Sequence, residues 1–267
     1  MKHHYLIALL LAATPALAHD LYLMPEKFVT QAASLLRFAF ENGDEFPAGG
    51  SAVKPSRLRN ARLLSKAGRV DIEKIAEQGK HTVAEVRVPG SGFAILTANT
   101  IPNFIELDAA KFKSYLEHEN LNEVIAWREA HGESAKSGRE RYSKYVKSLV
   151  LAGEPDAFYK ERTGLMIEIV LEADPYSLSP GKTLPALVLF RGKPAVNIAV
   201  ESAWLEGGKA KMEMIGRTDR LGRIRIPVVA AGPHRLHAIV MERCAEPKVA
   251  DWESFWASFT FEIPGKP

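Results

Sequence analysis

The sequence contains a single cysteine, Cys244, and this limits how the chain can be held together. An intrachain disulfide is excluded, because it needs two cysteines. Cys244 is therefore either a buried thiol, the common environment of a free cysteine, or a residue that pairs with another chain. Without disulfides the fold depends on its hydrophobic core, and a chain of 267 residues is long enough to form one.

The sequence also lacks a large excess of charge of one sign, and it has no long apolar run after residue 18. The 35 Lys and Arg residues against 32 Asp and Glu residues give a net charge of +3, and they are scattered, so nothing indicates nucleic-acid binding. A hydrophobic fraction of 46% excludes a disordered or collagen-like chain. After residue 18 no stretch is apolar enough to cross a membrane, which excludes a polytopic membrane protein.

The first 18 residues, MKHHYLIALLLAATPALA, have the pattern of a cleavable export signal. Lys2 gives a positive start, residues 5–13 form a short apolar segment, and residues 16–18 form a small-x-small cleavage site. An uncleaved anchor is the alternative, but the Ala-x-Ala ending favours cleavage. No cysteine follows the site, which argues against a lipoprotein anchor. We expect cleavage after Ala18 and a periplasmic protein that begins at His19.

Residues 19–107 carry the signals of short β-strands. Residues 35–40 and 93–98 are apolar runs bounded by turn residues, and residues 57–64 and 82–88 alternate with a period of two. About six or seven such strands predict an all-β sandwich.

Residues 108–152 predict a helical insertion. Asp108 is a suitable N-cap for a first helix, and Asn120 with Glu123 has capping-box spacing for a second that ends near residue 131. A third helix is expected from Arg139, because five apolar residues fall at the i, i+3, i+4, i+7 and i+8 spacing of one helix face. These residues are Tyr142, Tyr145, Val146, Leu149 and Val150. The basic residues between them, such as Lys147, are expected on the solvated face.

Residues 163–265 return to strand signals and predict a second β-sandwich. The expected strands are 165–171, 184–190, 196–204, 211–218, 222–228, 235–241 and 256–263. His234 and His237 are three residues apart, so in a strand they face opposite sides of the sheet. They are therefore not predicted to chelate one ion together.

Three segments follow one another in this C-terminal part: RGKPAVNIAV at 191–200, TDRLGRIRIP at 218–227 and AGPHRL at 231–236. Gly-Lys-Pro and Asp-x-x-Gly are turn sequences, and the residues between them alternate. The pattern resembles a transthyretin-like or carboxypeptidase-regulatory-like module. The resemblance implies a prealbumin-like sandwich that serves as a structural or binding unit.

A second set of motifs runs through the mature chain in a fixed order. It comprises AHDLYLMP at 18–25, HGE at 131–133, GRERY at 138–142, ADPY at 173–176, MER at 241–243 and DWESFWAS at 251–258. The set resembles a bacterial periplasmic family of unknown function that is grouped near the substrate-specific components of nickel uptake. The resemblance implies an exported protein built from immunoglobulin-like sandwiches, accessory to transition-metal uptake and without an assigned reaction.

The strand pattern and the two resemblances together predict a mainly β fold. We expect two immunoglobulin-like or prealbumin-like sandwiches, at residues 19–107 and 163–265, with a short helical insertion at 108–152 between them. Length alone is compatible with one large domain or two.

His19 is the leading candidate for a metal ligand. After cleavage it offers an α-amino nitrogen and an imidazole on one residue, a chelating pair that suits Cu(II) or Ni(II). The α-amino group titrates near neutral pH and can lose its proton to a metal. The alternative is that His19 is a flexible, unliganded first residue.

A second ligand is needed, and His131 at a helix end is the one that we predict. Its alternative role is a C-cap histidine that interacts with the helix dipole. Met212 and Met214 lie on one face of a strand and form a possible thioether pair for Cu(I), although two core methionines are the commoner outcome. The aromatic residues Trp252, Trp256, Phe255 and Phe259 line a ligand groove or, more simply, belong to the core.

Three functions are compatible with these features. The first, which we favour, is a non-enzymatic periplasmic protein that binds or delivers nickel, cobalt or copper through His19 and His131, without an organic cofactor. Its partner is then an inner- or outer-membrane component of a metal transporter. The second is a metal-free β-sandwich module that recognises a protein or a glycan. The third, a copper-dependent oxidative enzyme, ranks last because its second histidine cannot be chosen from the sequence.

Overall fold

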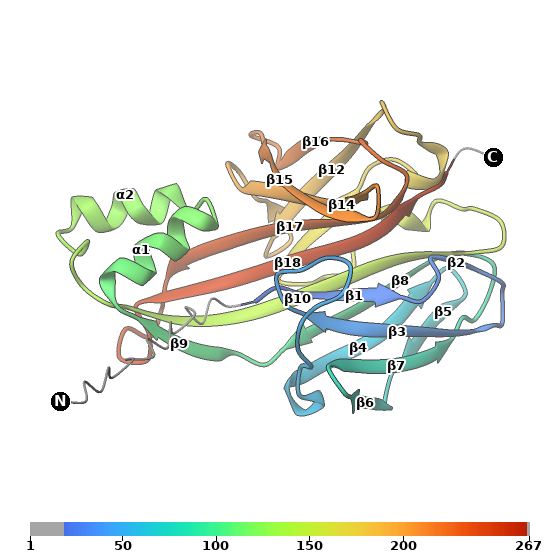
Figure 1. Cartoon of the computed structure of the whole chain (residues 1–267), viewed down its shortest axis with the longest axis horizontal. Coiled ribbons are helices and arrows are strands. Elements are labelled where there is room, and N and C mark those ends of the chain that lie inside the picture. Colours follow the sequence, from blue (N-terminus) through green and yellow to red (C-terminus); the bar gives the residue numbers. More distant parts are fainter. Residues whose placement is uncertain (1–18, 266–267) are drawn as a thin grey trace, which may run out of the picture.

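The computed structural model of the chain describes residues 19–265, so the predicted signal peptide lies outside the described residues. The fold is mainly β, as the sequence predicts, and its described part has three sheets and a pair of α-helices (Figure 1). Within residues 19–265, no helix has the length and apolar character needed to span a membrane.

The largest sheet runs through the whole molecule (Figure 1). Its strands lie in the order β15 (Lys209–Arg217), β14 (Ala199–Glu206), β17 (Gly232–Arg243), β18 (Trp252–Ile263), β10 (Gly138–Ala152), β8 (Gly92–Thr100), β4 (Leu58–Ser65) and β5 (Gly68–Asp71). Two short strands, β2 (Val29–Thr30) and β9 (Asn103–Leu107), also pair with β10. The long strands β10 and β18 are parallel neighbours, which joins the N-terminal and C-terminal halves of the chain in one sheet.

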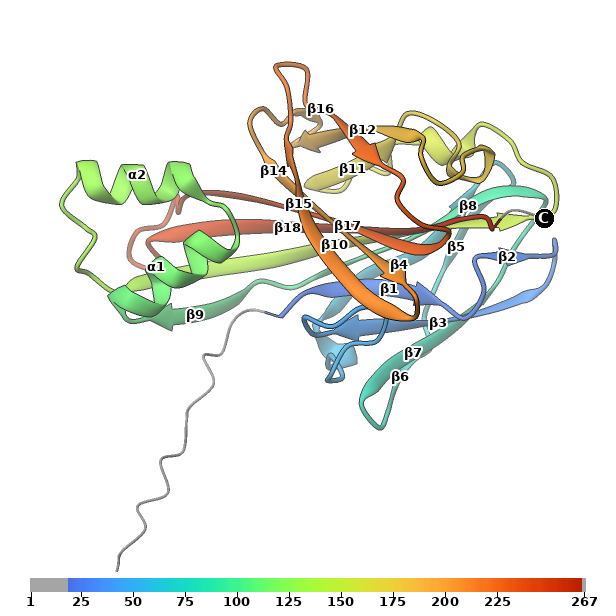
Figure 2. The ribbon, with the colours of Figure 1, turned by 45° about the horizontal axis from the view of Figure 1, so that its top comes forward.

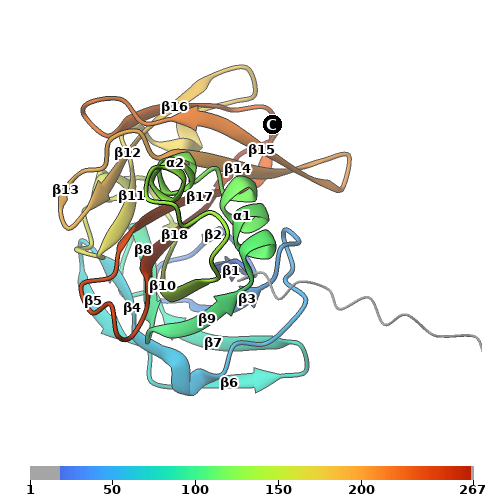
Figure 3. The ribbon, with the colours of Figure 1, turned by 90° about the vertical axis from the view of Figure 1, so that its left-hand side faces the viewer.

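Two smaller sheets cover opposite faces of the large one (Figures 2 and 3). One contains β1 (Leu21–Pro25), β3 (Leu35–Asn42), β7 (His81–Arg87) and β6 (Ile75–Gln78). The other contains β11 (Ile167–Leu171), β12 (Thr183–Phe190), β13 (Lys193–Pro194) and β16 (Arg223–Pro227). Short 3-10 helices lie at Pro55–Arg57, Phe158–Lys160 and Pro175–Ser177. Each small sheet encloses a hydrophobic core with the large sheet.

Residues 138–152 form strand β10, and the prediction of a helix from Arg139 is wrong. Because β10 lies inside the large sheet, both of its faces are buried. Leu149 and Leu151 pack into the core beneath β11 and β12, whereas Val146 and Val150 pack into the core beneath β3 and β7. The second half of β10, residues 145–152, is mostly apolar, as is typical of a strand that is buried on both faces. Such a run also contains the spacing of a helix face, so periodicity alone does not distinguish the two.

The same alternation divides the aromatic residues of β18 between two environments. Phe255 and Phe259 face the core under β11 and β12. Trp252 and Trp256 face the opposite side, where they pack against the helices. All four are buried, which confirms that they are core residues.

The helices α1 (Ala109–His118) and α2 (Asn122–Ala130) cover one end of the large sheet (Figure 3). Asp108 caps α1 by accepting a hydrogen bond from the Lys111 amide at 2.9 Å, as predicted. The expected capping box at Asn120 does not form, because Leu121 is the N-cap of α2 and has no side-chain cap bond. Tyr115 of α1 stacks on Trp256, with 6.2 Å between the ring centroids.

Lys147 was expected in solvent but is buried between the large sheet and β11. Its Nζ lies 2.8 Å from Oε1 of Glu168 and donates to the carbonyl of Ile169 at 3.0 Å. Glu168 also accepts hydrogen bonds from the amides of Thr163 and Gly164. Burial favours the neutral amine and lowers the pKa of Lys147, although Glu168 opposes this effect. Both buried charges therefore depend on each other.

Glu140 is a second buried ionisable group, and it lies beneath α1. Its Oε1 accepts hydrogen bonds from the Tyr115 hydroxyl at 3.0 Å and from the Ser254 hydroxyl. Burial disfavours the carboxylate and raises the pKa of Glu140 to about 7, despite the opposing hydrogen bonds from Ser254 and Tyr115. The packing of the helices on the sheet is thus linked to the protonation of this group.

Replacing Lys147 with Met should lower the free energy of unfolding by about 3–5 kcal/mol, because Glu168 would remain buried without its partner charge. The double variant Lys147→Met/Glu168→Gln should lose less than the sum of the two single variants. Urea unfolding of the four proteins measures both quantities. Strictly additive losses would contradict the dependence of one charge on the other.

The stability should fall between about pH 4.5 and pH 7, because folded Glu140 keeps a proton that the unfolded chain releases in this range. A pKa raised from 4.5 to about 7 corresponds to about 3 kcal/mol. Glu140→Gln should remove this fall, so that its stability relative to the parent protein improves from pH 5 to pH 8. Urea unfolding tests this, with the exposed Glu129→Gln as the control. If the difference in the free energy of unfolding between Glu140→Gln and the parent protein does not change with pH, the raised pKa of Glu140 would be contradicted.

Candidate functional site

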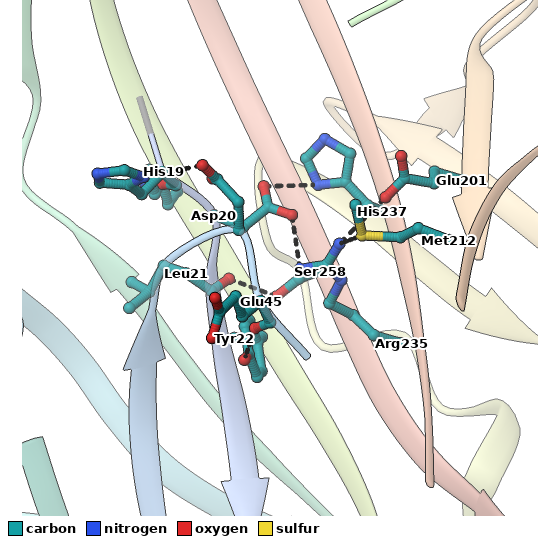
Figure 4. A network of polar contacts seen from close by, with 12 residues as sticks. His19, Asp20, Leu21, Tyr22, Glu45, Glu201, Met212, Arg235, His237 and Ser258 are labelled. Atoms are coloured by element: carbon teal, nitrogen blue, oxygen red, sulfur yellow. Dashed lines mark hydrogen bonds and ion pairs between the residues drawn. The ribbon is translucent and has the colours of Figure 1, made fainter. Parts of the chain in front are cut away.

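The residues that begin the described chain lie on the face of the large sheet that also carries the helices. Three hydrogen bonds fix alternate carbonyls of this segment to β10 and β18. Lys144 donates to the carbonyl of His19, Ser258 to that of Leu21 at 2.7 Å, and Thr260 to that of Leu23 at 2.6 Å. Figure 4 shows His19, Asp20 and Leu21 in this position, beside β17 and β18. Because these residues are held by contacts far along the chain, the segment is an integral part of the sandwich.

Arg235 of β17 is the centre of a charged cluster beside this segment (Figure 4). Its side chain is 1% exposed. One end of the guanidinium lies 2.8 Å from Asp20 Oδ2, and the other lies 3.0 Å from Glu201 Oε1 and 3.2 Å from Met212 Sδ. The guanidinium also lies over the ring of Tyr22, 5.3 Å from its centroid. Two carboxylates therefore compensate one buried cation.

His237 lies two residues further along the same face of β17. Its Nδ1 is 3.2 Å from Asp20 Oδ1, and its Nε2 is 3.5 Å from Glu119 Oε2, at the end of α1. The imidazole also contacts the edge of Trp256. The side chain is 8% exposed, and its Nε2 makes no hydrogen bond within the described structure.

The charges around His237 and Asp20 stabilise each other. Burial opposes the imidazolium, but Asp20 and Glu119 outweigh burial and raise the pKa of His237 above its ordinary value. Burial likewise opposes the carboxylate of Asp20, but His237 and Arg235 hold its pKa below the ordinary value. For Lys144, burial dominates over the attraction of Asp20 and lowers the pKa to about 8. The cluster therefore favours a charged carboxylate and a charged imidazole in contact.

These side chains surround a small opening, which we call the N-terminal pocket. It is lined by Asp20, Asp44, His118, Glu119, Glu201, Met212, Arg235 and His237. Its cavity volume is about 20 Å³, room for about one water molecule. The pocket thus combines four carboxylates, two imidazoles, a thioether and one guanidinium, from six separate segments of the chain.

The structure does not bring the two predicted metal ligands together. His19 is half-exposed and lines a neighbouring pocket with Tyr142 and Lys144, and its Nδ1 lies 3.1 Å from Oδ2 of Asp44, which lines the N-terminal pocket. His131 lies at the end of α2, where its Nδ1 is 2.7 Å from the carbonyl of Trp127 and its ring stacks on that indole at 3.8 Å. His131 thus has the position and contacts of a C-cap residue.

The other sequence candidates have separate outcomes. Met212 and Met214 lie on the edge strand β15 and are 42% and 47% exposed, so the prediction that they are core residues is wrong. His234 and His237 do face opposite sides of β17, since His234 stacks on Phe261. Cys244 is a buried free thiol, as expected.

Sequence reasoning missed the anionic half of the pocket. Asp20, Glu119 and Glu201 are isolated acidic residues in the sequence, and no motif connects them. One signal was present in β17, where Arg235 and His237 alternate with Leu236 and Ala238. A strand of a buried sheet that keeps two ionisable residues on one face indicates a polar site on that face.

Residues 19–265 contain no group of three or more His, Cys, Asp or Glu side chains that is arranged to hold a metal ion. Side chains alone therefore give pairs of donors, such as His19 with Asp44, and not a complete coordination sphere. A metal ion bound here would therefore need at least one ligand that is not a side chain.

Comparison with solved structures finds bacterial adhesins among the similar folds. The D0–D1 domain of intimin is 12% identical, with 90% of this chain and 97% of that chain covered and a TM-score of 0.23. The Escherichia coli adhesin FdeC is 11% identical, with 93% of this chain and 64% of that chain covered and a TM-score of 0.24. The Yersinia pseudotuberculosis adhesin InvE is also 11% identical, with 91% of this chain and 58% of that chain covered and a TM-score of 0.23. This chain thus spans less than two thirds of the latter two. Similarity this low carries no argument about function.

No curated protein matches the sequence. One family model does match, over residues 16–242, which is most of the chain. The protein therefore belongs to the family described as domain of unknown function DUF4198.

Proposed function

We propose that this protein is exported, cleaved after Ala18, and acts in the periplasm as a non-enzymatic β-sandwich module that binds a partner protein. We assign the binding site to the N-terminal pocket and the bound group to a positively charged side chain of that partner. The observation that carries this proposal is the charge of the pocket, where four carboxylates face one guanidinium.

Binding fits the pocket better than catalysis does. His237 is the side chain best placed to act as a general base, but it is buried between two carboxylates that favour its protonated form. Its side chain is only 8% exposed, so a substrate has little access to it. The remaining charged groups are engaged with one another, which orients them for recognition.

The charge balance of the pocket favours a cationic ligand. Arg235 compensates Asp20 and Glu201, which leaves Glu119 and Asp44 with only histidines as partners. A guanidinium or ammonium group that reaches the mouth of the pocket can form charge-assisted hydrogen bonds with these carboxylates. A clustered negative potential of this kind also steers a basic surface towards the site.

The size of the pocket favours a protein over a glycan. Its cavity volume of about 20 Å³ holds about one water molecule, so a sugar ring does not fit inside and a partner side chain can contact the carboxylates only at the mouth. The edge strand β15 borders the pocket through Met212 and offers free backbone groups beside it. An extended segment of a partner protein that pairs with β15 would place a side chain at the pocket.

The relation to nickel uptake and the transthyretin-like module remain predictions from the sequence. A membrane component of a metal transporter is one partner compatible with the proposal. The metal-binding pair His19 and His131 receives no support from their separate positions.

A photo-crosslinking amino acid at position 212 should capture one protein species in intact cells, because Met212 is exposed and lines the pocket. The same probe at Leu221, which is exposed in the turn before β16, should not capture it. The double variant Glu119→Gln/Asp44→Asn should reduce the affinity for the purified partner by about 10- to 100-fold, since hydrogen bonds to charged groups contribute about 1.5–3 kcal/mol.

The matched control is Glu129→Gln with Asp71→Asn, which removes the same charges from exposed positions outside the pocket. An adduct that is equally strong at both probe positions, or an affinity unchanged by the pocket variant, would contradict the proposed site. Binding of a glycan in place of a protein would contradict the assigned class of partner.

A further inference from the structure

We infer that the contact between His19 and Asp44, beside the N-terminal pocket, becomes a site for one divalent transition metal ion, Cu(II) or Ni(II), when the chain is cleaved after Ala18. The ligands are the α-amino nitrogen and Nδ1 of His19 and the carboxylate of Asp44. The inference rests on the proposed cleavage, and it does not require the proposed protein partner.

Two of the three donors already lie at the spacing of neighbouring metal ligands. Nδ1 of His19 and Oδ2 of Asp44 are 3.1 Å apart. Nitrogen and oxygen ligands bind such ions at about 2.0–2.2 Å, so two of them at a right angle are about 3 Å apart. An ion can therefore replace the proton between these atoms without a large movement of either side chain.

The third donor is absent from the uncleaved chain. The nitrogen of His19 is an amide while it is joined to Ala18, and it becomes a free amine on cleavage. This amine and Nδ1 belong to one residue, so they close a chelate ring with the ion. The donor set is then two nitrogens and one carboxylate oxygen, a combination that suits Cu(II) and Ni(II). It also explains why side chains alone give no group of three in residues 19–265.

The backbone beside the new amine is held by contacts with the rest of the fold. Lys144 donates to its carbonyl, and the next residue, Asp20, is fixed by Arg235 and His237. A chain end is usually poorly ordered unless such contacts hold it. The new terminus therefore starts from a fixed position beside Asp44, which reduces the entropy lost when the ion binds.

The charge of Asp44 is available to a bound cation. Among the described residues its carboxylate forms an ion pair with His19 alone. A dication between these two side chains would therefore meet an anionic oxygen that no buried cation compensates.

The test uses protein exported with its own signal and checked by intact mass to begin at His19. Calorimetric titration with Cu(II) and with Ni(II) should show one ion per chain with submicromolar affinity for at least one of them. Affinity should rise between about pH 6 and pH 8, because the amine must lose its proton. The electron paramagnetic resonance spectrum of the Cu(II) form should show nitrogen coupling.

Three variants separate the donors. His19→Ala, and a chain with an N-terminal extension that makes His19 an internal residue, should each lose affinity by at least about 100-fold, and Asp44→Asn by about 10-fold. Asp71→Asn, an exposed carboxylate that pairs with Arg69, should bind as the parent does. Equal affinity in the extended chain and the processed chain would overturn the role of the amine.

An unchanged affinity in Asp44→Asn would overturn the role of the carboxylate. An N-terminus other than His19 would overturn both this site and the proposed cleavage. Metal binding without any crosslinked partner would leave this site supported and the proposed protein-binding function rejected, so the two failures are distinguishable.

Discussion

The burial of the Arg235 guanidinium is the constraint on which the polar side of this molecule depends. A cation that is 1% exposed is stable only with compensating charges, and Asp20 and Glu201 supply them from distant parts of the sequence. Asp20 belongs to the first residues of the described chain, so this single pairing attaches the N-terminal segment to β17. His237 uses the other oxygen of the same carboxylate and extends the attachment to Glu119 of the helical pair.

The large sheet allows such a site to exist on an otherwise apolar scaffold. Along β17 and β18 the middle of one face is apolar, from Leu236 to Val240 and from Phe255 to Phe261, since it packs against the small sheet of β11 and β12. The other face changes character along its length, from Trp252 and Trp256 under the helices to Ser258 and Thr260 under β1. The N-terminal pocket lies where these two coverings meet. There neither the helices nor β1 fills the surface, and charged residues take the place of core residues.

The sequence predicts the fold class because strand signals depend on local alternation and turns. It fails at β10, where burial of both faces produces a helix-like spacing, and at Met212 and Met214, whose edge position exposes them. The site is harder to predict. His19 is recognisable from its place after the cleavage motif. Asp44, Glu119 and Glu201 are far apart in the sequence, and only the folded chain brings them together at the N-terminal pocket. His131 stacks on Trp127 and does not meet His19, because α2 directs its side chain onto that indole. The sequence alone does not show this direction.

The central claim is that residues 19–21 are held in place by the charged cluster and not merely adjacent to it. Hydrogen exchange of the processed protein, followed by mass spectrometry, tests this most directly. The account predicts slow exchange in the peptide that covers residues 19–25, and a local loss of this protection in Asp20→Asn while the amides of β18 stay protected. Exchange of this peptide in the parent protein at the rate of an unstructured chain would contradict the account.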